Sequence, residues 1–384
     1  MRIGLFYFAL YASVGITLAY LPPYFQSLGF SGKQIALAVS LQPLLMIVVP
    51  PVWGFLADRT RRPVLLLRIA CVGAFLAFSP MLVATTVPAV VATLGVFALF
   101  STTLASLIDS VAVVEARRMG TDYARLRLWG SVGFVAASYA FGLWLSHGGD
   151  AHDAVWWALA AMAGHATAAQ LVRPAPDAAI AAPPSVREAG QLLRRPALLV
   201  FFAAAMLHWA AMAPYHMLFA IHLRDLGASA TSVGAGFALA VSAEVLVMWR
   251  FRDLIRRLPI ERLMFVAFAS GIVRFLITGL SQDGTVIAVA QALHGLTYGA
   301  FYVCAILWLE REVAPRLRAT GRALYSSLVY GIGGVLGNAV AGALYDAGGG
   351  SLAFLVAAGM DFVPPLLLVL SMRLAASETQ RPAP

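Results

Sequence analysis

The chain has 384 residues, of which 61% are hydrophobic and only 12% are charged, and its formal net charge is +9. A soluble domain is roughly 45–50% apolar and about 25% charged, so this composition excludes an ordinary water-soluble enzyme. Apolar runs of about 20 residues, long enough to cross a bilayer as helices, follow one another along the whole chain. The expected fold class is therefore an all-α, polytopic membrane protein.

In chain order, about twelve apolar spans are predicted. They cover residues 3–26, 34–56, 64–86, 88–116, 122–146 and 153–172 in the first half, and 196–222, 232–251, 261–280, 284–311, 318–345 and 351–373 in the second half. The segment between the halves is rich in Ala and Pro and carries scattered charges, which is typical of a linker. We expect an N-terminal bundle over 1–174, a cytoplasmic linker over 175–195 and a C-terminal bundle over 196–384.

Arginine is distributed unevenly between the loops. If the N-terminus is cytoplasmic, the loops on that side hold nearly every arginine, whereas the opposite segments hold only Lys33 and Arg224 as bases. This positive-inside pattern predicts a plasma-membrane protein with both termini in the cytoplasm. The basic loops would face anionic lipid of the bilayer, so no nucleic-acid partner is expected. Arg274 is the one base left within a span.

The two halves contain a weak repeat. The segment after the first span, Leu28-Gly29-Phe30-Ser31, matches Leu226-Gly227-Ala228-Ser229 after the seventh, and Arg125-Leu126-Arg127 matches Arg316-Leu317-Arg318. Both copies keep the same sidedness, so the repeats are parallel. Two six-helix bundles in parallel repeat resemble the major facilitator superfamily. This resemblance implies a twelve-helix secondary transporter of small molecules that works as a monomer.

The loop after the second span strengthens the resemblance. Its sequence, Gly54-Phe55-Leu56-Ala57-Asp58-Arg59-Thr60-Arg61-Arg62, is similar to the superfamily's cytoplasmic motif G-x-x-x-D-R/K-x-G-R/K-R/K, except that Arg61 replaces the second glycine. The resemblance implies a cytoplasmic gate formed by Gly54, Asp58, Arg59 and Arg62. Asp58 would then meet basic groups or helix N-termini of the other bundle when this side closes. The alternative is a solvated loop acid that is balanced by its own arginines.

Asp109 in the fourth span and Arg127 at the start of the fifth are charges within apolar surroundings. A charge at the bilayer centre costs roughly 2.5–3.5 kcal/mol on insertion scales, a cost that the two could offset by facing each other. Alternatively, Arg127 extends to the membrane surface and Asp109 packs alone. The stretch from Arg125 to Phe134 resembles the fifth helix of lactose-permease-like symporters. This implies substrate binding by Asp109, Arg127, Ser131 and Phe134, the last as an aromatic platform.

The second half carries matching groups. Arg274 and His294 have the spacing found in the same symporters, and Glu244 resembles their acid that touches both substrate and proton pathway. The resemblance implies that Arg274 contacts the substrate and that Glu244 and His294 take part in proton coupling. The symporters' proton-carrying carboxylate is replaced here by Thr297, and the run from His294 to Gly299 looks like the phenylpropionate permease branch.

Asp361, beside Pro364 and Pro365 in the twelfth span, is a third candidate for proton coupling. The alternative is an acid at a helix terminus with no coupling role. His208 and His216 in the seventh span are interpreted as polar packing groups. They are also the only pair that could support an intramembrane enzyme, and no carboxylate lies near them in the sequence.

Together these features predict proton symport of a small organic solute, such as an aromatic acid, a sugar or a nucleoside-like compound. The two bundles would work by alternating access, driven by the proton gradient and without cofactor or metal. The alternative is a proton-coupled exporter of drugs or metabolites with the same fold. Exporters often carry a Gly/Pro-rich signature in the fifth helix, and the run from Gly130 to Trp144 has no proline.

Overall fold

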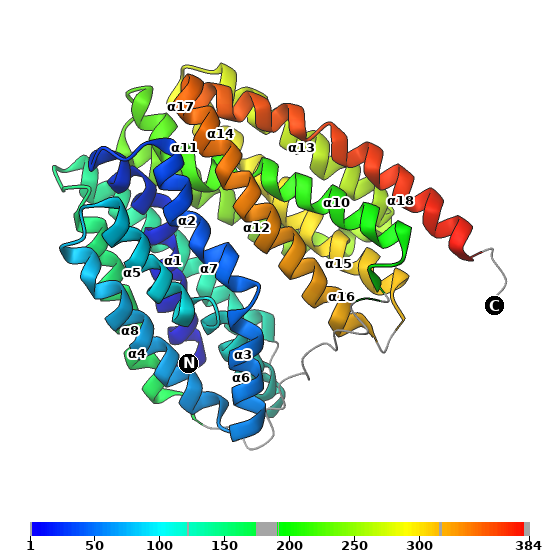
Figure 1. Ribbon diagram of the computed structural model, residues 1–384, viewed down its shortest axis with the longest axis horizontal. Coiled ribbons are helices and arrows are strands. Elements are labelled where there is room, and N and C mark those ends of the chain that lie inside the picture. Colours follow the sequence, from blue (N-terminus) through cyan, green and yellow to red (C-terminus); the bar gives the residue numbers. More distant parts are fainter. Residues whose placement is uncertain (1, 121–122, 174–189, 191, 315–316, 380–384) are drawn as a thin grey trace.

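The computed structural model describes residues 2–120, 123–173, 190, 192–314 and 317–379. The regular elements in these ranges are all helices, and they form two bundles (Figure 1). The N-terminal bundle contains α1 (Arg2–Ser27), α2 (Gly32–Met46), α3 (Val49–Thr60), α4 (Pro63–Phe78), η1 (Ser79–Leu82), α5 (Val87–Ser101), α6 (Leu104–Arg118), α7 (Tyr123–Ser146) and α8 (Asp153–Leu171). The predicted linker over 175–195 falls mostly outside the described residues.

The C-terminal bundle is more irregular. Its elements are α10 (Pro196–Ala211), α11 (Ala213–Asp225), α12 (Ala230–Arg257), α13 (Ile260–Leu280), α14 (Gly284–Ala290), η2 (Gln291–Leu293), η3 (Gly295–Ala300), α15 (Phe301–Glu312), α16 (Arg318–Tyr325), η5 (Ser326–Ile332), α17 (Gly333–Met360) and α18 (Val363–Thr379). The segments η3 and η5 are π-helical, with wider turns than an α-helix.

Ten described segments are long and apolar enough to cross a membrane. The last of them, Thr320–Glu378, has 59 residues, and non-helical backbone at Gly348 and Gly349 divides it. It therefore corresponds to the eleventh and twelfth predicted spans. The sixth predicted span is α8, which has 19 residues and is not among the ten.

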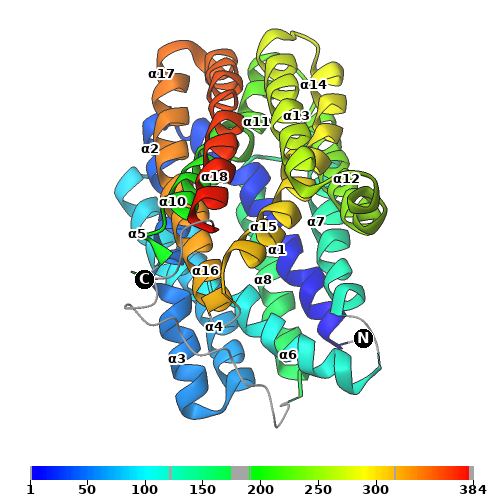
Figure 2. The same cartoon turned by 90° about the vertical axis from the view of Figure 1, so that its right-hand side faces the viewer.

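The bundles meet at one face of the molecule and separate toward the other (Figures 1 and 2). Extensive contacts between them join α1 to α11, α2 to α17 and α7 to α12. In contrast, α3, α6, α15 and α16 make their extensive contacts within their own bundle. We call the end where α1 meets α11 the closed face, and the end that carries α3, α6 and α16 the open face.

Polar contacts tie the closed face together. The Asp346 carboxylate accepts hydrogen bonds from the main-chain N–H groups of Gly32 and Lys33, at 2.5 and 3.1 Å. This places a negative charge at the N-terminus of α2, where the helix dipole favours it. Tyr345 donates to Asp225 at 2.9 Å and accepts from Gln26 at 2.8 Å.

The same face depends on two glycines that allow α2 and α17 to touch. A Cβ atom on Gly342 would lie 2.4 Å from the carbonyl oxygen of Gly32, and one on Gly32 would lie 2.5 Å from that of Gly342. Any side chain at either position must push the two helices apart. The closed face therefore forms only because both residues are glycine.

We predict that Gly342→Leu shifts the protein toward a state with this face open. Spin labels at Ser27→Cys and Ala347→Cys, both exposed, report the separation by electron spin resonance, with the buried Cys71 and Cys304 replaced by alanine. The variant should show a longer-distance population that the parent lacks. Gly359→Leu on the same helix is the control, because a Cβ there meets no atom within 4 Å. Identical distance distributions in all three proteins would refute the prediction.

The predicted gate motif lies on the open face. Gly54 is half-buried, Arg59 and Arg62 are exposed, and neither arginine has a hydrogen bond or ion pair among the described side chains. The side chain of Asp58 lies outside the described part of the structure. Arg61, which replaces the motif's second glycine, ends α3 in the left-handed region at φ 52° and ψ 30°. The loop thus has the backbone conformation that suits glycine, although the residue is arginine.

We predict that Arg61→Gly stabilises the protein. The left-handed conformation is unfavourable for a residue with a Cβ, and glycine removes this cost while losing more chain entropy on folding, so the net gain should be about 0.5–1 kcal/mol. Thermal unfolding of purified protein measures it. Arg62→Gly is the matched control, because φ is −130° there and the substitution should not stabilise. Equal effects of both substitutions would show that backbone strain at Arg61 is unimportant.

Candidate functional site

The helices of the C-terminal bundle lose regular geometry where its buried polar groups lie. The seventh span breaks at Met212 between α10 and α11, and the tenth passes through η2 and η3. The twelfth breaks at Asp361, after which Pro364 and Pro365 start the next helix. Backbone groups released by such breaks can bind side chains or ions, and π-helical turns often occur at functional sites.

Arg274 occupies the centre of this region and is completely buried. Its Nε donates to Gln291 Oε1 at 2.8 Å and its Nη1 donates to His294 Nδ1 at 3.0 Å. The guanidinium carbon lies 4.0 Å from the centre of the Tyr215 ring. Arg274 forms no ion pair in the described part of the chain, and its buried Nη2 has no hydrogen-bond partner there.

This contact fixes the proton on His294. A guanidinium can only donate, so Nδ1 of His294 must accept and carries no proton. The neutral ring then holds its proton on Nε2, which faces Glu244 Oε2 at 4.0 Å. His294 can become positively charged only if Arg274 moves away. The chain Glu244–His294–Arg274 thus links an acid that is one-fifth exposed to a fully buried cation.

The N-terminal bundle holds its two charges with tyrosines. Tyr7 donates to Asp109 Oδ1 at 2.5 Å, and Arg127 Nη2 donates to the Tyr11 hydroxyl at 2.6 Å. The Arg127 guanidinium also lies 4.0 Å from the centre of the Tyr11 ring. Asp109 and Arg127 form no direct ion pair in the described structure. Instead, two tyrosines one turn apart on α1 hold the acid and the base side by side.

The next residues of α7 have different surroundings. A Cβ on Gly130 would lie 2.7 Å from Arg127 Nη1 and 2.8 Å from the Tyr11 ring, so this glycine makes room for the stacked pair. Ser131 is half-buried, and its side chain has no hydrogen bond among the described residues. Phe134 is buried in the hydrophobic core, and its main chain lies against Gly15 of α1.

The charged groups of the two bundles face each other across the contact between α7 and α12. We call Asp109 and Arg127 the N-terminal wall, and Glu244 and Arg274 the C-terminal wall. Arg127 is close enough to act electrostatically on Glu244, although no ion pair joins them within the described residues. Tyr298 of the tenth span stacks on His294 and on Tyr302, with ring centroids 5.4 and 5.9 Å apart, and the neighbouring Gly299 lies against Glu244. Residues from both bundles thus surround one polar region at the interface between α7 and α12.

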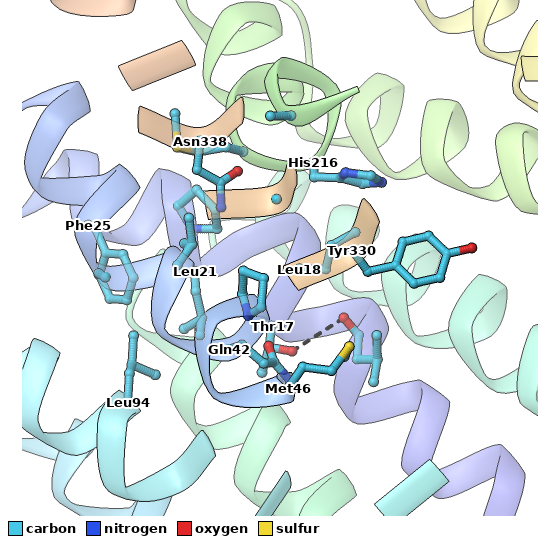
Figure 3. A pocket seen from close by; sticks show the side chains of 18 of the residues that line it. Thr17, Leu18, Leu21, Phe25, Gln42, Met46, Leu94, His216, Tyr330 and Asn338 are labelled. Atoms are coloured by element: carbon cyan, nitrogen blue, oxygen red, sulfur yellow. Dashed lines mark hydrogen bonds between the residues drawn. The ribbon is translucent and has the colours of Figure 1, made fainter. Parts of the chain in front are cut away.

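A cavity of about 400 Å³ lies on the other side of the same interface, between α1, α2 and α5 of one bundle and α10, α11 and α17 of the other (Figure 3). It is mostly apolar, with a few polar side chains, of which Thr17, Gln42, His216, Tyr330 and Asn338 are labelled in the figure. None of the sequence-predicted site residues lines it. Tyr298 connects the two regions, because it lines the cavity and stacks on His294 with ring centroids 5.4 Å apart.

A second buried pair lies behind this cavity. His208 Nδ1 is 2.7 Å from Asp361 Oδ1, and His208 Nε2 is 2.8 Å from the carbonyl oxygen of Thr297. Both side chains are almost fully buried, at 1% and 0% exposure. The other carboxylate oxygen of Asp361 has no hydrogen-bond partner in the described structure. The pair joins the seventh span to the break in the twelfth.

Sequence reasoning did not identify Tyr7, Tyr11, Tyr215 or the pairing of His208 with Asp361. The signal for the first two was present, since tyrosines four residues apart share one face of a helix. His208 and Asp361 are 153 residues apart, and no local pattern relates them.

Comparison with known proteins fits this architecture. A model of the MFS_1-like family matches residues 1–356. Maltose permease of Geobacillus stearothermophilus is 29% identical over 347 residues, which cover 89% of this chain and 86% of that protein. The probable 3-phenylpropionic acid transporter of Escherichia coli is 27% identical over 253 residues, which cover 65% of this chain and 66% of that protein.

A solved structure shows the same fold. The crystal structure of the nucleoside transporter NupG, as its D323A mutant, superposes with a TM-score of 0.88 at 19% identity and covers 97% of this chain and 98% of that one. The predicted resemblance to the major facilitator superfamily and the all-α fold are thus confirmed. The chain belongs to the MFS_1-like family and is a multi-pass membrane transporter of small solutes, not an enzyme.

Proposed function

We propose that this transporter is a proton symporter that takes up a small organic solute through the plasma membrane. The observation that carries the proposal is the pair of charged walls, with Asp109 and Arg127 on one bundle and Glu244 and Arg274 on the other. Charged groups inside membrane spans are costly, and they typically serve substrates or ions. Two walls on separately moving bundles suit alternating access.

The solute is expected to carry a carboxylate or hydroxyl groups. A guanidinium stacked on an aromatic ring, as Arg127 is on Tyr11, offers several donors in a fixed plane. Asp109 can accept from hydroxyls on the same wall, and Ser131 is a further polar contact. Phe134 is buried in this conformation, and its main chain lies against Gly15 of α1.

The relatives narrow the solute class. Their names refer to maltose, 3-phenylpropionic acid, nucleosides and xanthosine. A cavity of about 400 Å³ with aromatic rings and two side-chain amides is large enough for solutes of this size. We therefore propose an aromatic acid, a sugar or a nucleoside-like compound as the substrate.

Coupling needs a group that binds a proton together with the solute and releases it in the cytoplasm. Glu244, His294 and Asp361 are the proposed proton sites, and the proton gradient is the only energy source required. Glu244 is the partly exposed acid of the three, and it lies between Arg127 and the proton on His294. Neutralising Glu244 would weaken its attraction for Arg127 and for the N–H group of His294. Arg127 would then be available to the solute.

The open face is proposed to be cytoplasmic, because α1 begins there and the basic loops lie there. Both termini would then be in the cytoplasm, and the structure would represent an inward-open state. In the opposite state, Gly54, Asp58, Arg59 and Arg62 would form the gate that holds the cytoplasmic side shut. We expect the protein to work as a monomer, because each chain contains both walls of the site.

The direction of proton movement tests this function. Lightly buffered, de-energised cells that express the protein receive maltose, xanthosine or 3-phenylpropionate, and the external pH is recorded. At least one solute should make the medium alkaline, and Glu244→Gln should abolish the change, because the amide can neither bind a proton nor attract Arg127. Cells with empty vector and the variant Glu115→Gln serve as controls. Acidification would indicate an exporter instead, and absence of any pH change with confirmed surface expression would argue against proton symport.

The proposed substrate contact of Arg127 is tested by Arg127→Lys. Lysine keeps the charge but loses the planar fork and its stacking on Tyr11, so the KM for the transported solute should rise by about 10-fold or more, as expected for loss of one charged hydrogen bond. Solute counterflow in membrane vesicles measures this. Arg125→Lys, at the exposed neighbouring arginine, should have no such effect. An unchanged KM for Arg127→Lys would remove Arg127 from the substrate site.

A further inference from the structure

The hydrogen bonds around His208 determine how many protons the buried pair holds. The carbonyl oxygen of Thr297 can only accept, so Nε2 of His208 must carry a hydrogen. Nδ1 and Asp361 Oδ1 are 2.7 Å apart, and a hydrogen bond between them requires one proton. The pair is therefore either imidazolium with carboxylate or imidazole with carboxylic acid. Both forms hold one shared proton, and both have zero net charge.

Loss of this proton has a defined electrostatic result. The lone pairs of Nδ1 and Oδ1 would face each other at 2.7 Å, and a full negative charge would remain on the buried Asp361. No covalent bond other than the N–H or O–H bond changes, and the proton passes to water. We infer that His208 and Asp361 together form a single-proton site and that, given the proposed symport, this pair is where proton binding is coupled to movement.

Aromatic rings and hydroxyl groups from several helices surround the pair. Phe268 on α13 and Phe301 on α15 place apolar rings 5.1 and 4.4 Å from the imidazole. Ser270 and Thr297 contribute hydroxyl groups that bond each other at 3.1 Å. Among the described residues, the charged or titratable groups around the pair are Arg274 and His294. Oδ2 of Asp361 lies against Gly271 of α13, one turn before Arg274.

Arg274 connects the pair to the substrate walls. Its Nη2 and the Oδ2 of Asp361 are both buried, and neither has a hydrogen-bond partner in the described structure. When the pair is neutral, Arg274 stays on His294. When the proton leaves, Asp361 becomes an uncompensated anion and attracts the guanidinium away from His294. His294 and Glu244 then lose their fixed arrangement. The conformation of these residues therefore depends on whether the pair holds its proton.

The position of the pair allows its proton to exchange. His208 and Thr297 are followed in the chain by Trp209 and Tyr298, and both of these rings line the cavity. The pair thus lies one layer of side chains behind the cavity wall. It is sealed in this conformation, so exchange with water requires a movement of that wall. The helix break at Asp361 and the π-helical η3 supply two places at which such movement can occur.

The first test needs no substrate. Infrared difference spectra of the purified protein are recorded between low and high pH for wild type, Asp361→Asn, His208→Gln and the control His222→Gln. His222 is also buried and bonds a carbonyl through Nε2, at 2.9 Å to Thr278, but it has no carboxylate partner among the described residues. Asp361→Asn should remove the pH-dependent carboxyl bands of the pair, and His208→Gln should remove its imidazole bands. His222→Gln should leave both sets of bands unchanged. Spectra of Asp361→Asn that match wild type would overturn the proposal.

The second test separates this inference from the proposed function. With maltose, xanthosine and 3-phenylpropionate as solutes, Asp361→Asn should keep solute exchange but lose accumulation driven by a pH gradient. If Asp361→Asn and His208→Gln both still accumulate solute, the pair is not the coupling site, although symport stands. If wild type moves no protons with solute while Asp361→Asn removes the carboxyl bands, the proton site stands and the symport proposal fails.

Discussion

A buried arginine without a carboxylate partner in the described structure sets the organisation of the C-terminal bundle. Arg274 keeps its charge at any physiological pH, so its surroundings must supply what water would otherwise give. They do so with neutral groups, namely an amide, an imidazole nitrogen and the face of a tyrosine ring. This arrangement leaves the buried Nη2 without an acceptor in the described structure, so the guanidinium can still bind a nearby group that becomes negative.

The irregular helices follow from the same requirement. A regular membrane helix satisfies its own carbonyl and N–H groups and has none to offer. The π-helical turn of η3 places the Thr297 carbonyl where His208 can donate to it, and the break after α17 sets Asp361 against the same imidazole. Packing of these breaks at one level collects the polar groups into one region. Such segments also bend more readily than continuous helices, which suits a site that must change partners.

The two bundles hold their charges in different ways. On the N-terminal side, phenolic hydroxyls on the continuous helix α1 fix Asp109 and Arg127, and these donors do not change charge near neutral pH. On the C-terminal side, imidazoles and carboxyl groups can gain or lose protons. This difference is expected if the N-terminal bundle mainly positions the solute and the C-terminal bundle responds to protons.

The sequence by itself determined the class of molecule, its spans, its family and the charged residues within the spans, because hydrophobic length and charge placement are local properties. The partners of those charges were decided by the tertiary structure. Asp109 was expected either to face Arg127 or to pack alone, and the structure instead pairs the acid with Tyr7 and the base with Tyr11. Phe134 is buried in the core, and its main chain lies against Gly15 of α1. His208 was interpreted as a packing group, but the fold pairs it with Asp361. Such contacts depend on helix rotation and on where helices break, which spacing along the chain does not specify.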